Sequence, residues 1–303
     1  MRKILLTGKD GQVGWELQRS LAPLGNVVAV DYQEMDLADP DSVRKIVREV
    51  RPGLIVNAAA YTAVDKAESE PDLAMAVNGV APGIMAEESK RLNAAIIHYS
   101  TDYVFDGAGE RPYVEDDMPN PLSVYGRTKL AGEQAIQASG APHLILRTSW
   151  VYGARGRNFL LTILRLAGER SELKIVNDQI GAPTWSRMLA EVTSQIVAQS
   201  FSPLCRQATP IQDVSGIYHA VAAGSTSWHG FAAKILECAP GHALPAPPKL
   251  VPIPTSGYPL PATRPRNSCL SNEKLMRTYG LVIPTWEESL AMCLQEITAA
   301  SAT

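Results

Sequence analysis

The chain has 303 residues, of which 46% are hydrophobic and 19% charged, so it is long enough and apolar enough to bury a sizeable core. Its net charge is −3, from 28 basic and 31 acidic residues, which leaves no basic surplus to bind a nucleic-acid backbone. Residues 1–8 hold too short an apolar run for a secretory signal, and no run approaches the length of a membrane span. We expect a cytoplasmic protein with no nucleic-acid or membrane partner.

The four cysteines, Cys205, Cys238, Cys269 and Cys293, lie far apart in the sequence and form no CxxC pair. That spacing suits neither a zinc site nor a disulfide framework. We therefore expect four reduced thiols, as is usual for a protein inside the cell, and no metal site.

Up to about residue 150, short apolar runs alternate with amphipathic stretches. Strands are expected at residues 3–7, 26–30, 54–57, 94–99 and 143–147, and helices at residues 12–24, 41–50, 71–91 and 121–139. Strands that are apolar throughout are typical of a sheet covered on both faces, and their alternation with helices indicates parallel βαβ units. Residues 1–150 are therefore predicted to form a doubly wound, Rossmann-like α/β domain that binds a dinucleotide.

Beyond residue 150 this rhythm breaks. Strands are expected near residues 174–176 and 216–221, and helices at residues 159–167 and 185–197. Residues 151–303 are predicted to form mainly a smaller, irregular and discontinuous substrate-binding domain, with segments near 180–222 returning to the first domain. The proline-dense stretch 240–265 excludes regular helix, and it is either a linker or a loop that covers a ligand.

A glycine-rich loop follows the first expected strand. Gly8, Gly11 and Gly14 form a GxxGxxG pattern, in which Gln12 and Val13 open the next helix. Glycines allow a tight turn and the close approach of a pyrophosphate, and the N-terminus of a helix offers free N–H groups to an anion. The pattern alone is weak, but its place directly after a strand predicts a dinucleotide site.

Two further strand ends point to the same site. Asp31 follows the second strand, where a carboxylate can accept the adenosine ribose hydroxyls; this favours NADH, whereas Lys9 could pair with the 2′-phosphate of NADPH, so both cofactors stay open. Ala58, Ala59 and Ala60 follow the third strand, and their small side chains would let a cofactor lie against the backbone. Tight helix packing explains these alanines equally well.

Tyr125 and Lys129 lie four residues apart in an expected helix, which places both side chains on one face. A nearby ammonium would lower the pKa of the tyrosine toward a range useful for giving a proton to a carbonyl oxygen. Lys129 would also hold the nicotinamide ribose. Because the YxxxK pattern is common on solvated helix faces, it gains weight only from its companions.

The chief companion is Thr101, at the end of the fourth expected strand. Its hydroxyl could donate to the same carbonyl oxygen, since the carboxyl ends of parallel strands face one cleft. Asn78, in the preceding helix, is either part of a water or ribose relay or an incidental polar residue. Together these residues predict an oxidoreductase that passes hydride from a nicotinamide cofactor to a carbonyl carbon.

Taken as a set, these motifs resemble the extended short-chain dehydrogenase/reductase family, and more closely its reductases of dTDP-linked keto-sugars. The resemblance runs nearly from end to end of the chain. It is carried by residues 4–18, 57–68, 100–105, 125–132, 147–152, 177–184 and 264–268.

The resemblance implies a catalytic trio of Thr101, Tyr125 and Lys129, which uses NADPH or NADH. The implied reaction reduces the C4 ketone of dTDP-6-deoxy-L-lyxo-4-hexulose to dTDP-L-rhamnose, for rhamnose-containing surface polysaccharide. The residues implied for the substrate are Thr62, Val64, Asp102, Tyr103 and Trp150 at the sugar, and Asn158, Arg264 and the turn 178–179 toward the nucleotide. Those implied for the cofactor also include Asp36 and Leu37. For Tyr103 and Trp150, burial as core aromatics is the alternative.

Some members of this family dimerise through Mg²⁺ held by glutamates. Glu16 matches one such position, but Arg187 stands where another would be expected, and a cation beside a divalent ion is unfavourable. We therefore doubt a metal-linked dimer, whereas a homodimer of another kind stays open.

Two alternative functions fit the same resemblance. A nucleotide-sugar dehydratase, the nearest rival together with the epimerases, would carry Thr-Asp-Glu at the active strand, but Tyr103 stands at the third position and lacks that acid. A non-catalytic regulatory subunit that binds NADP would resemble the same family, and intact Tyr125 and Lys129 do not exclude it.

Overall fold

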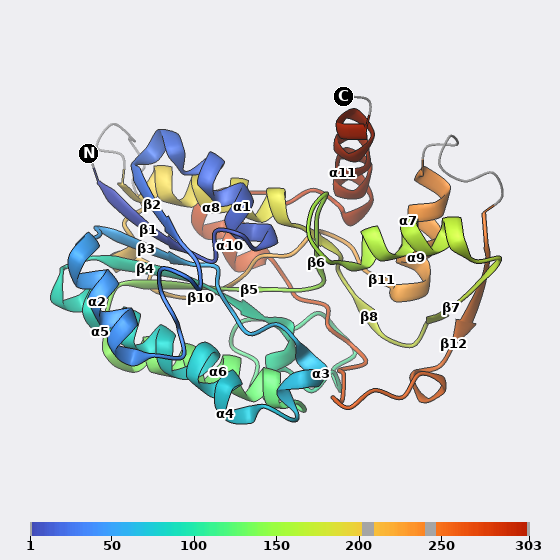
Figure 1. The fold of residues 1–303 in the computed structure, drawn as a ribbon, viewed down its shortest axis with the longest axis horizontal. Helices are drawn as coiled ribbons and strands as arrows, with labels where there is room; N and C mark the ends of the chain where they lie inside the picture. Colours follow the sequence, from blue (N-terminus) through green and yellow to red (C-terminus); the bar gives the residue numbers. More distant parts are fainter. Residues whose placement is uncertain (1, 202–208, 240–246, 302–303) are drawn as a thin grey trace.

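The structure, a computed structural model, describes residues 2–201, 209–239 and 247–301. Within these ranges the chain forms a larger region around a parallel sheet and a smaller region of helices and short strands beside it (Figure 1). Cys205 lies outside the described residues, and the three described cysteines are free thiols, as predicted. No helix in the described ranges is both long and apolar enough to cross a membrane.

Six strands of the described chain form the main sheet, in the order β10-β5-β4-β3-β1-β2 with every pair parallel. Their bounds are β1 (Lys3–Thr7), β2 (Asn26–Val30), β3 (Leu54–Asn57), β4 (Ala95–Thr101), β5 (His143–Thr148) and β10 (Gly216–His219). The chain runs outward from β1 to β2 and then in the opposite direction from β3, so the strand order reverses between β1 and β3. Open α/β sheets bind ligands at such a switch point, outside the carboxyl ends of the strands. The predicted doubly wound, Rossmann-like fold is confirmed.

Helices cover both faces of this sheet, as Figure 1 shows. One face packs on α2 (Pro40–Val50), α5 (Ala81–Arg91) and α6 (Val124–Ser139); the other packs on α1 (Gln12–Ser20), α8 (Ser186–Phe201) and α10 (Glu273–Tyr279). The cause lies in the strand sequences, whose successive residues point to opposite faces. In β1, Leu5 enters the core under α2 and α5, whereas Ile4 and Leu6 enter the core under α1 and α8, and all three are fully buried.

Several predicted helices have different ends in the structure. The helix expected at 12–24 stops at Ser20, and a 3₁₀ turn, η1 (Ala22–Leu24), takes over where Pro23 lacks the N–H that would continue it. The stretch 71–91 is helical throughout but is divided into α4 (Pro71–Met75), a π-helical turn η2 (Ala76–Val80), and α5. The helix expected from residue 121 begins at Val124, after its capping residue Ser123.

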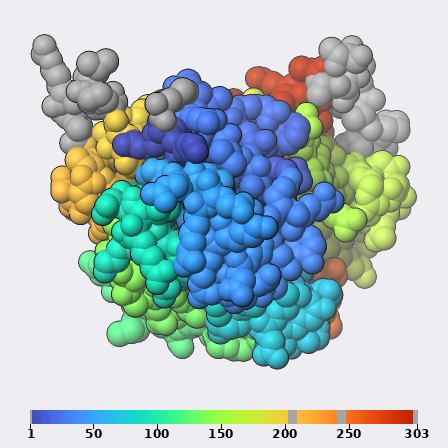
Figure 2. Space-filling model, turned by 60° about the vertical axis from the view of Figure 1, so that its left-hand side comes forward, coloured from blue at the N-terminus to red at the C-terminus, as the bar shows by residue number. Residues whose placement is uncertain are grey.

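The second half of the chain supplies β10, α8 and α10 to the larger region. The first two fall within or close to residues 180–222, and α10 lies beyond them. The elements of the smaller region and its borders are β6 (Val151–Tyr152), α7 (Phe159–Glu169), β7 (Glu172–Val176), β8 (Ile180–Gly181), β9 (Thr184–Trp185), β11 (Thr226–Ser227), α9 (Trp228–Cys238), β12 (Lys249–Ile253) and α11 (Trp286–Ser301). Figure 2 shows the larger region from another side, with yellow-green residues of the smaller region at its right edge.

The described part of the proline-dense stretch, residues 247–265, is tied to the body of the protein at both ends. β12 pairs in parallel with β7, and the loop after it, which includes the turn η5 (Thr255–Gly257), runs back to α3 (Val64–Ala67). There Arg264 forms an ion pair with Asp65. A loop held in this way is not a free linker. Residues 240–246 lie outside the described ranges.

Candidate active site

The glycine loop turns from β1 into α1 in a conformation that only glycines allow. Gly8 has a φ of +75°, in the left-handed region. A Cβ on Gly14 would lie 1.9 Å from the carbonyl oxygen of Gly8, and a Cβ on Gly8 would lie 2.8 Å from the nitrogen of Ala59. Gly11 precedes α1 and no side chain caps the first turn, which begins with Gln12 and Val13. The N–H groups of this turn can therefore bind an anion.

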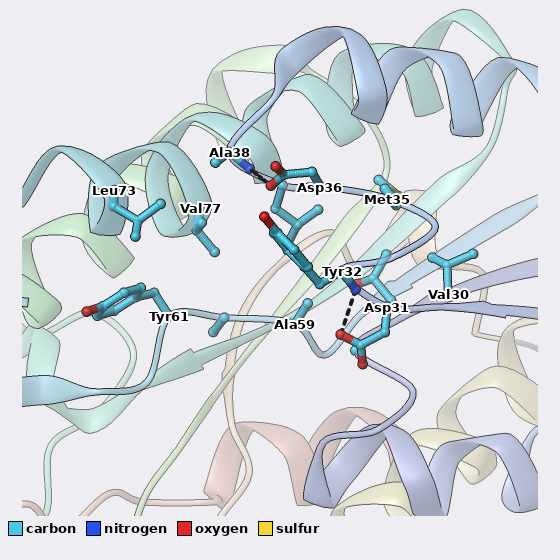
Figure 3. Close-up of a pocket in the computed structure, with 14 residues that line it drawn as sticks. Val30, Asp31, Tyr32, Met35, Asp36, Ala38, Ala59, Tyr61, Leu73 and Val77 are labelled. Carbon is cyan, nitrogen blue, oxygen red and sulfur yellow. Dashed lines mark hydrogen bonds between the residues drawn. The ribbon is translucent and has the colours of Figure 1, made fainter. Parts of the chain in front are cut away.

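A cavity of about 240 Å³ lies beside this loop (Figure 3). The predicted cofactor residues that line it are Gly8, Asp31, Asp36, Leu37, Ala59 and Ala60. Residues that the sequence reasoning missed complete the wall: Thr7, Val30, Tyr32, Met35, Ala38, Tyr61, Leu73 and Val77. Leu73 and Val77 project from the helix over the cavity (Figure 3). A largely apolar slot with a carboxylate at its edge is a suitable shape and chemistry for adenosine.

Charged groups cluster at the end of β2. Asp31 accepts hydrogen bonds from the backbone N–H groups of Asp10 (3.0 Å) and Tyr32 (2.7 Å). Lys9 pairs with Glu34, whose second oxygen accepts the N–H of Asp31 at 2.9 Å. The hydrogen bond from Lys9 holds the pKa of the Glu34 carboxyl below its ordinary value. Lys9, the residue predicted to meet a 2′-phosphate, is thus already paired with a carboxylate.

Two glycines allow α6, which carries Tyr125 and Lys129, to pack closely on its neighbours. A Cβ on Gly126 would lie 2.2 Å from the carbonyl oxygen of Tyr103, and a Cβ on Gly132 would lie 2.2 Å from that of Asn78. The helix start is fixed by Ser123, whose hydroxyl accepts the N–H of Gly126 at 3.1 Å. These contacts set the position of Tyr125 relative to β4.

Thr101, Tyr125 and Lys129 meet at the carboxyl end of β4. The hydroxyl of Thr101 donates to Oδ1 of Asp102 at 3.0 Å and neighbours the hydroxyl of Tyr125. The ring of Tyr103 packs edge-on against that of Tyr125, with centroids 5.6 Å apart. Two adjacent hydroxyl groups of this kind can both donate to one carbonyl oxygen.

The pKa values in this cluster correct one expectation. The pKa of Tyr125 is raised to about 12, not lowered, because the protein atoms that crowd its hydroxyl desolvate the phenolate and Asp102 repels it; the neighbouring hydroxyl of Thr101 acts in the opposite direction. Lys129 does not counter this effect, since its Nζ donates to the carbonyl oxygen of Tyr99 at 2.6 Å and lies 3.1 Å from Nε2 of His98. Burial lowers the pKa of Lys129 itself to about 8.

Asn78 has a role that neither sequence interpretation anticipated. Its side chain accepts the N–H of Tyr61 at 2.8 Å and donates to the carbonyl oxygen of Tyr61 at 3.0 Å. It also donates to the hydroxyl of Thr128 at 3.2 Å. The residue thereby fixes the segment after β3 to α6, and so links the cavity beside the glycine loop to the helix of Tyr125.

A larger cavity, of about 800 Å³, lies in the smaller region between α7, β7 and the loop after β12. Trp228, Gln179 and Arg264 line it, and Nε1 of Trp228 donates to Gln179 at 3.2 Å. Arg264 binds both carboxylate oxygens of Asp65, at 2.7 and 3.1 Å. Trp228 and the cavity were not foreseen, because the residues that form them are distant in sequence.

Comparison with known proteins identifies the family. Residues 1–299 match the family described as RmlD substrate binding domain. The chain is 49% identical over 298 residues to a dTDP-4-dehydrorhamnose reductase of Burkholderia thailandensis, with 97% of this chain and 99% of that protein covered. This chain belongs to the dTDP-4-dehydrorhamnose reductase family. The resemblance predicted from the sequence is confirmed.

Solved structures of this reductase family share the fold over nearly the whole chain. The Clostridium acetobutylicum dTDP-4-dehydrorhamnose reductase has a TM-score of 0.88 and 36% identity, and covers 98% of this chain and 99% of its own. The Bacillus anthracis dTDP-4-dehydrorhamnose reductase, solved in complex with NADP, has a TM-score of 0.87 and 34% identity, and covers 97% and 99%.

The remaining residues that the family resemblance implied lie in different surroundings. Trp150 has a φ of +46° and stacks flat on Trp228, with ring centroids 3.6 Å apart, while Tyr103 packs on Tyr125. Both rings keep some exposure, so neither is a fully buried core aromatic. Thr62 is exposed, and Val64 begins α3. Asn158 caps α7 and donates to Gln12 at 2.9 Å, which places it beside the glycine loop.

Arg187 lies against Glu16, as the sequence suggested. Its Nε donates to Glu16 at 3.2 Å, and its Nη2 donates to Glu296 at 3.0 Å. A guanidinium therefore contacts both carboxylates at this point between α1, α8 and α11. Among the described residues, no group of three or more His, Cys, Asp or Glu side chains is arranged to hold a metal ion.

Proposed function

We propose that this protein reduces the C4 ketone of dTDP-6-deoxy-L-lyxo-4-hexulose to dTDP-L-rhamnose, with NADPH or NADH as the reductant. The observation that carries this proposal is the pair of neighbouring hydroxyl groups of Thr101 and Tyr125 at the carboxyl end of β4, in a member of the dTDP-4-dehydrorhamnose reductase family. A dehydratase would need an acid where Tyr103 stands, and a regulatory subunit would bind NADP without turnover.

The residues present fit a dinucleotide. The tight loop from Gly8 to Gly14 and the uncapped start of α1 suit a pyrophosphate, and Asp31 at the edge of the apolar cavity suits the adenosine ribose. Ala58, Ala59 and Ala60 leave room beside them, and Lys129 would hold the second ribose. When bound, the nicotinamide supplies the hydride that reaches the ketone carbon.

Tyr125 donates the proton that completes the reduction. A pKa of about 12 keeps its hydroxyl protonated at neutral pH, as a proton donor requires. Its O–H bond breaks as the ketone oxygen gains negative charge, and the alcohol product keeps that proton. Thr101 turns its hydroxyl from Asp102 to donate a second hydrogen bond to the same oxygen, which stabilises the developing charge.

The larger cavity suits the nucleotide half of the substrate. Arg170 and Lys174 bring positive charge to a wall that also holds Glu172. Arg264 in the same wall is paired with Asp65. The first two cations, which form no ion pair within the described ranges, suit a diphosphate, and the Trp228 ring offers a flat surface for a pyrimidine base. With Trp150 stacked on Trp228, the sugar would lie toward Tyr103 and Tyr125.

The test is an assay of the purified protein with dTDP-4-keto-6-deoxyglucose and the partner epimerase, with NADPH and NADH in parallel. The proposal expects loss of the nicotinamide absorbance that depends on both the protein and the keto-sugar. No loss with either cofactor contradicts it. A cytoplasmic location and a homodimer stay predictions from the sequence, and light scattering would measure the second.

A further inference from the structure

Three buried polar side chains form a row across the sheet under Lys129. Thr7 on β1 is in register with Asn57 on β3, and Asn57 is in register with His98 on β4. Asn57 and His98 have no exposed surface, and Lys129 is 1% exposed. The proposed reaction gives no role to Thr7, Asn57 or His98. Burying polar groups costs free energy unless they are hydrogen-bonded.

The orientation of the Asn57 amide is determined by its neighbours. The backbone N–H of Ala59 points to Oδ1 of Asn57 at 3.2 Å, and a backbone N–H can only donate. The hydroxyl of Thr7 lies 2.7 Å from the same oxygen. Nδ2 is therefore the atom that faces His98, at 2.9 Å from its Nδ1, and an amide nitrogen can only donate.

This orientation selects one tautomer of His98. Because Nδ1 accepts from Asn57, the ring proton of a neutral imidazole must be on Nε2. The ring is neutral, since burial holds the pKa of His98 well below its ordinary value. The opposite tautomer would place two donors against each other at the contact with Asn57.

Nε2–H of His98 is thus directed at Nζ of Lys129, 3.1 Å away. An ammonium has no lone pair and cannot accept this hydrogen bond, whereas an amine can accept it while donating to the carbonyl oxygen of Tyr99. Of the other charged groups near Lys129, Glu133 favours the ammonium, but its carboxylate is held by the buried Arg147 at 2.7 Å. Burial also acts against the ammonium.

We propose that Asn57 and His98 are positioning residues that stabilise the amine form of Lys129: Asn57 holds His98 as the Nε2–H tautomer, and His98 donates to the amine. Lys129 therefore loses its proton more readily than a solvated lysine does. The consequence of this state for turnover rests on the proposed reductase function.

The test uses the protein without substrate, so that its failure is distinct from failure of the reductase assignment. The chain has five histidines, which can be isotope-labelled. Two-bond nitrogen–proton NMR correlations then report the tautomer of each ring, and His98→Gln assigns the signal of His98. We expect His98 to be the Nε2–H tautomer between about pH 6 and pH 9. A Nδ1–H tautomer, or an imidazolium that titrates near its ordinary pKa, overturns the proposal.

Two variants extend the test. Asn57→Asp places an acceptor against Nδ1, so His98 should change to the Nδ1–H tautomer; an unchanged tautomer contradicts the argument. In His98→Gln, the side-chain carbonyl can accept a hydrogen bond from the Lys129 ammonium. The pKa of Lys129 should therefore rise by at least about one unit, a tenfold change in ionisation. NMR of lysine-labelled protein measures this pKa, and Lys129→Met assigns the signal. The pH profile of kcat should shift in the same direction. If His98→Gln does not fold, Asn57→Asp supplies the assignment and the comparison; an unchanged pKa in folded His98→Gln refutes the role of His98.

Discussion

Gly126 has a role in the chemistry that a substitution by alanine should expose. The added Cβ would lie 2.2 Å from the carbonyl oxygen of Tyr103 and 2.9 Å from Cβ of Pro121. To reach ordinary van der Waals contact, the first turn of α6 must move by about 1 Å away from the turn Asp102–Val104 that follows β4. Tyr125 is the residue before Gly126, and a misplacement of this size at a reacting group can lower a rate about 100-fold. We therefore expect Gly126→Ala to lower kcat about 100-fold and to destabilise the fold by roughly 1–3 kcal/mol.

The matched control is Gly168→Ala, a helical glycine in α7 whose Cβ would have no atom within 4 Å. Alanine is the better helix former, so this variant should keep wild-type kcat and gain up to about 1 kcal/mol of stability. Steady-state kinetics and urea unfolding of the two variants, measured side by side, provide the comparison. A folded Gly126→Ala protein with kcat within twofold of wild type would refute the reasoning that this contact positions Tyr125.

Three further predictions concern the proton donor, the cofactor and a buried acid. Tyr125→Phe should lower kcat by about 10²–10⁴-fold while cofactor affinity, measured by fluorescence titration, stays near wild type; unchanged kcat would remove Tyr125 from the mechanism. Glu34→Gln leaves Lys9 free to meet a 2′-phosphate, so kcat/KM for NADPH should rise several-fold relative to kcat/KM for NADH. A constant ratio of the two values would show that Lys9 does not contact the cofactor there. Burial raises the pKa of Asp102 to about 6, above its ordinary value. Between about pH 4 and pH 6 the folded state therefore holds a proton that the unfolded state has lost, so the stability of the wild-type protein falls as pH rises through this range. Asp102→Asn lacks this loss, and urea unfolding should show it gaining up to about 3 kcal/mol on wild type between these pH values; an equal difference at both pH values would contradict the shift.

Local sequence patterns predicted the sheet well because its strands are apolar on both faces. The apolar residues of runs such as 4–7 and 54–57 are buried, and the glycines at 8 and 14 mark where the chain must turn tightly. Thr101, Tyr125 and Asp31 could be proposed as site residues because strand ends and a four-residue helical spacing are visible in sequence. Parallel topology brings the ends of β2 and β4 to one edge of the sheet, whereas the place of Tyr125 also depends on the packing of α6.

What the sequence did not predict depends on contacts between distant segments. The pKa of Tyr125 was assigned the wrong direction because desolvation and the turn of Lys129 toward Tyr99 and His98 are visible only in three dimensions. Trp228 stacks on Trp150 and lines the larger cavity, and nothing near it in sequence indicates that partner. The row under Lys129 had a signal, since Asn57 and His98 are polar residues within otherwise apolar strands, and a polar residue at such a place needs a partner.

The central claim is that hydride reaches C4 of the dTDP-linked sugar while Tyr125 supplies the proton. Its most direct test is reduction with NADPH that carries deuterium at the transferred position of the nicotinamide, followed by NMR of the isolated sugar nucleotide. The account predicts dTDP-L-rhamnose with deuterium at C4 from the wild-type protein, and a rate at least about 100-fold lower from Tyr125→Phe. Deuterium at another carbon, no deuterated product, or equal rates from the two proteins would contradict it.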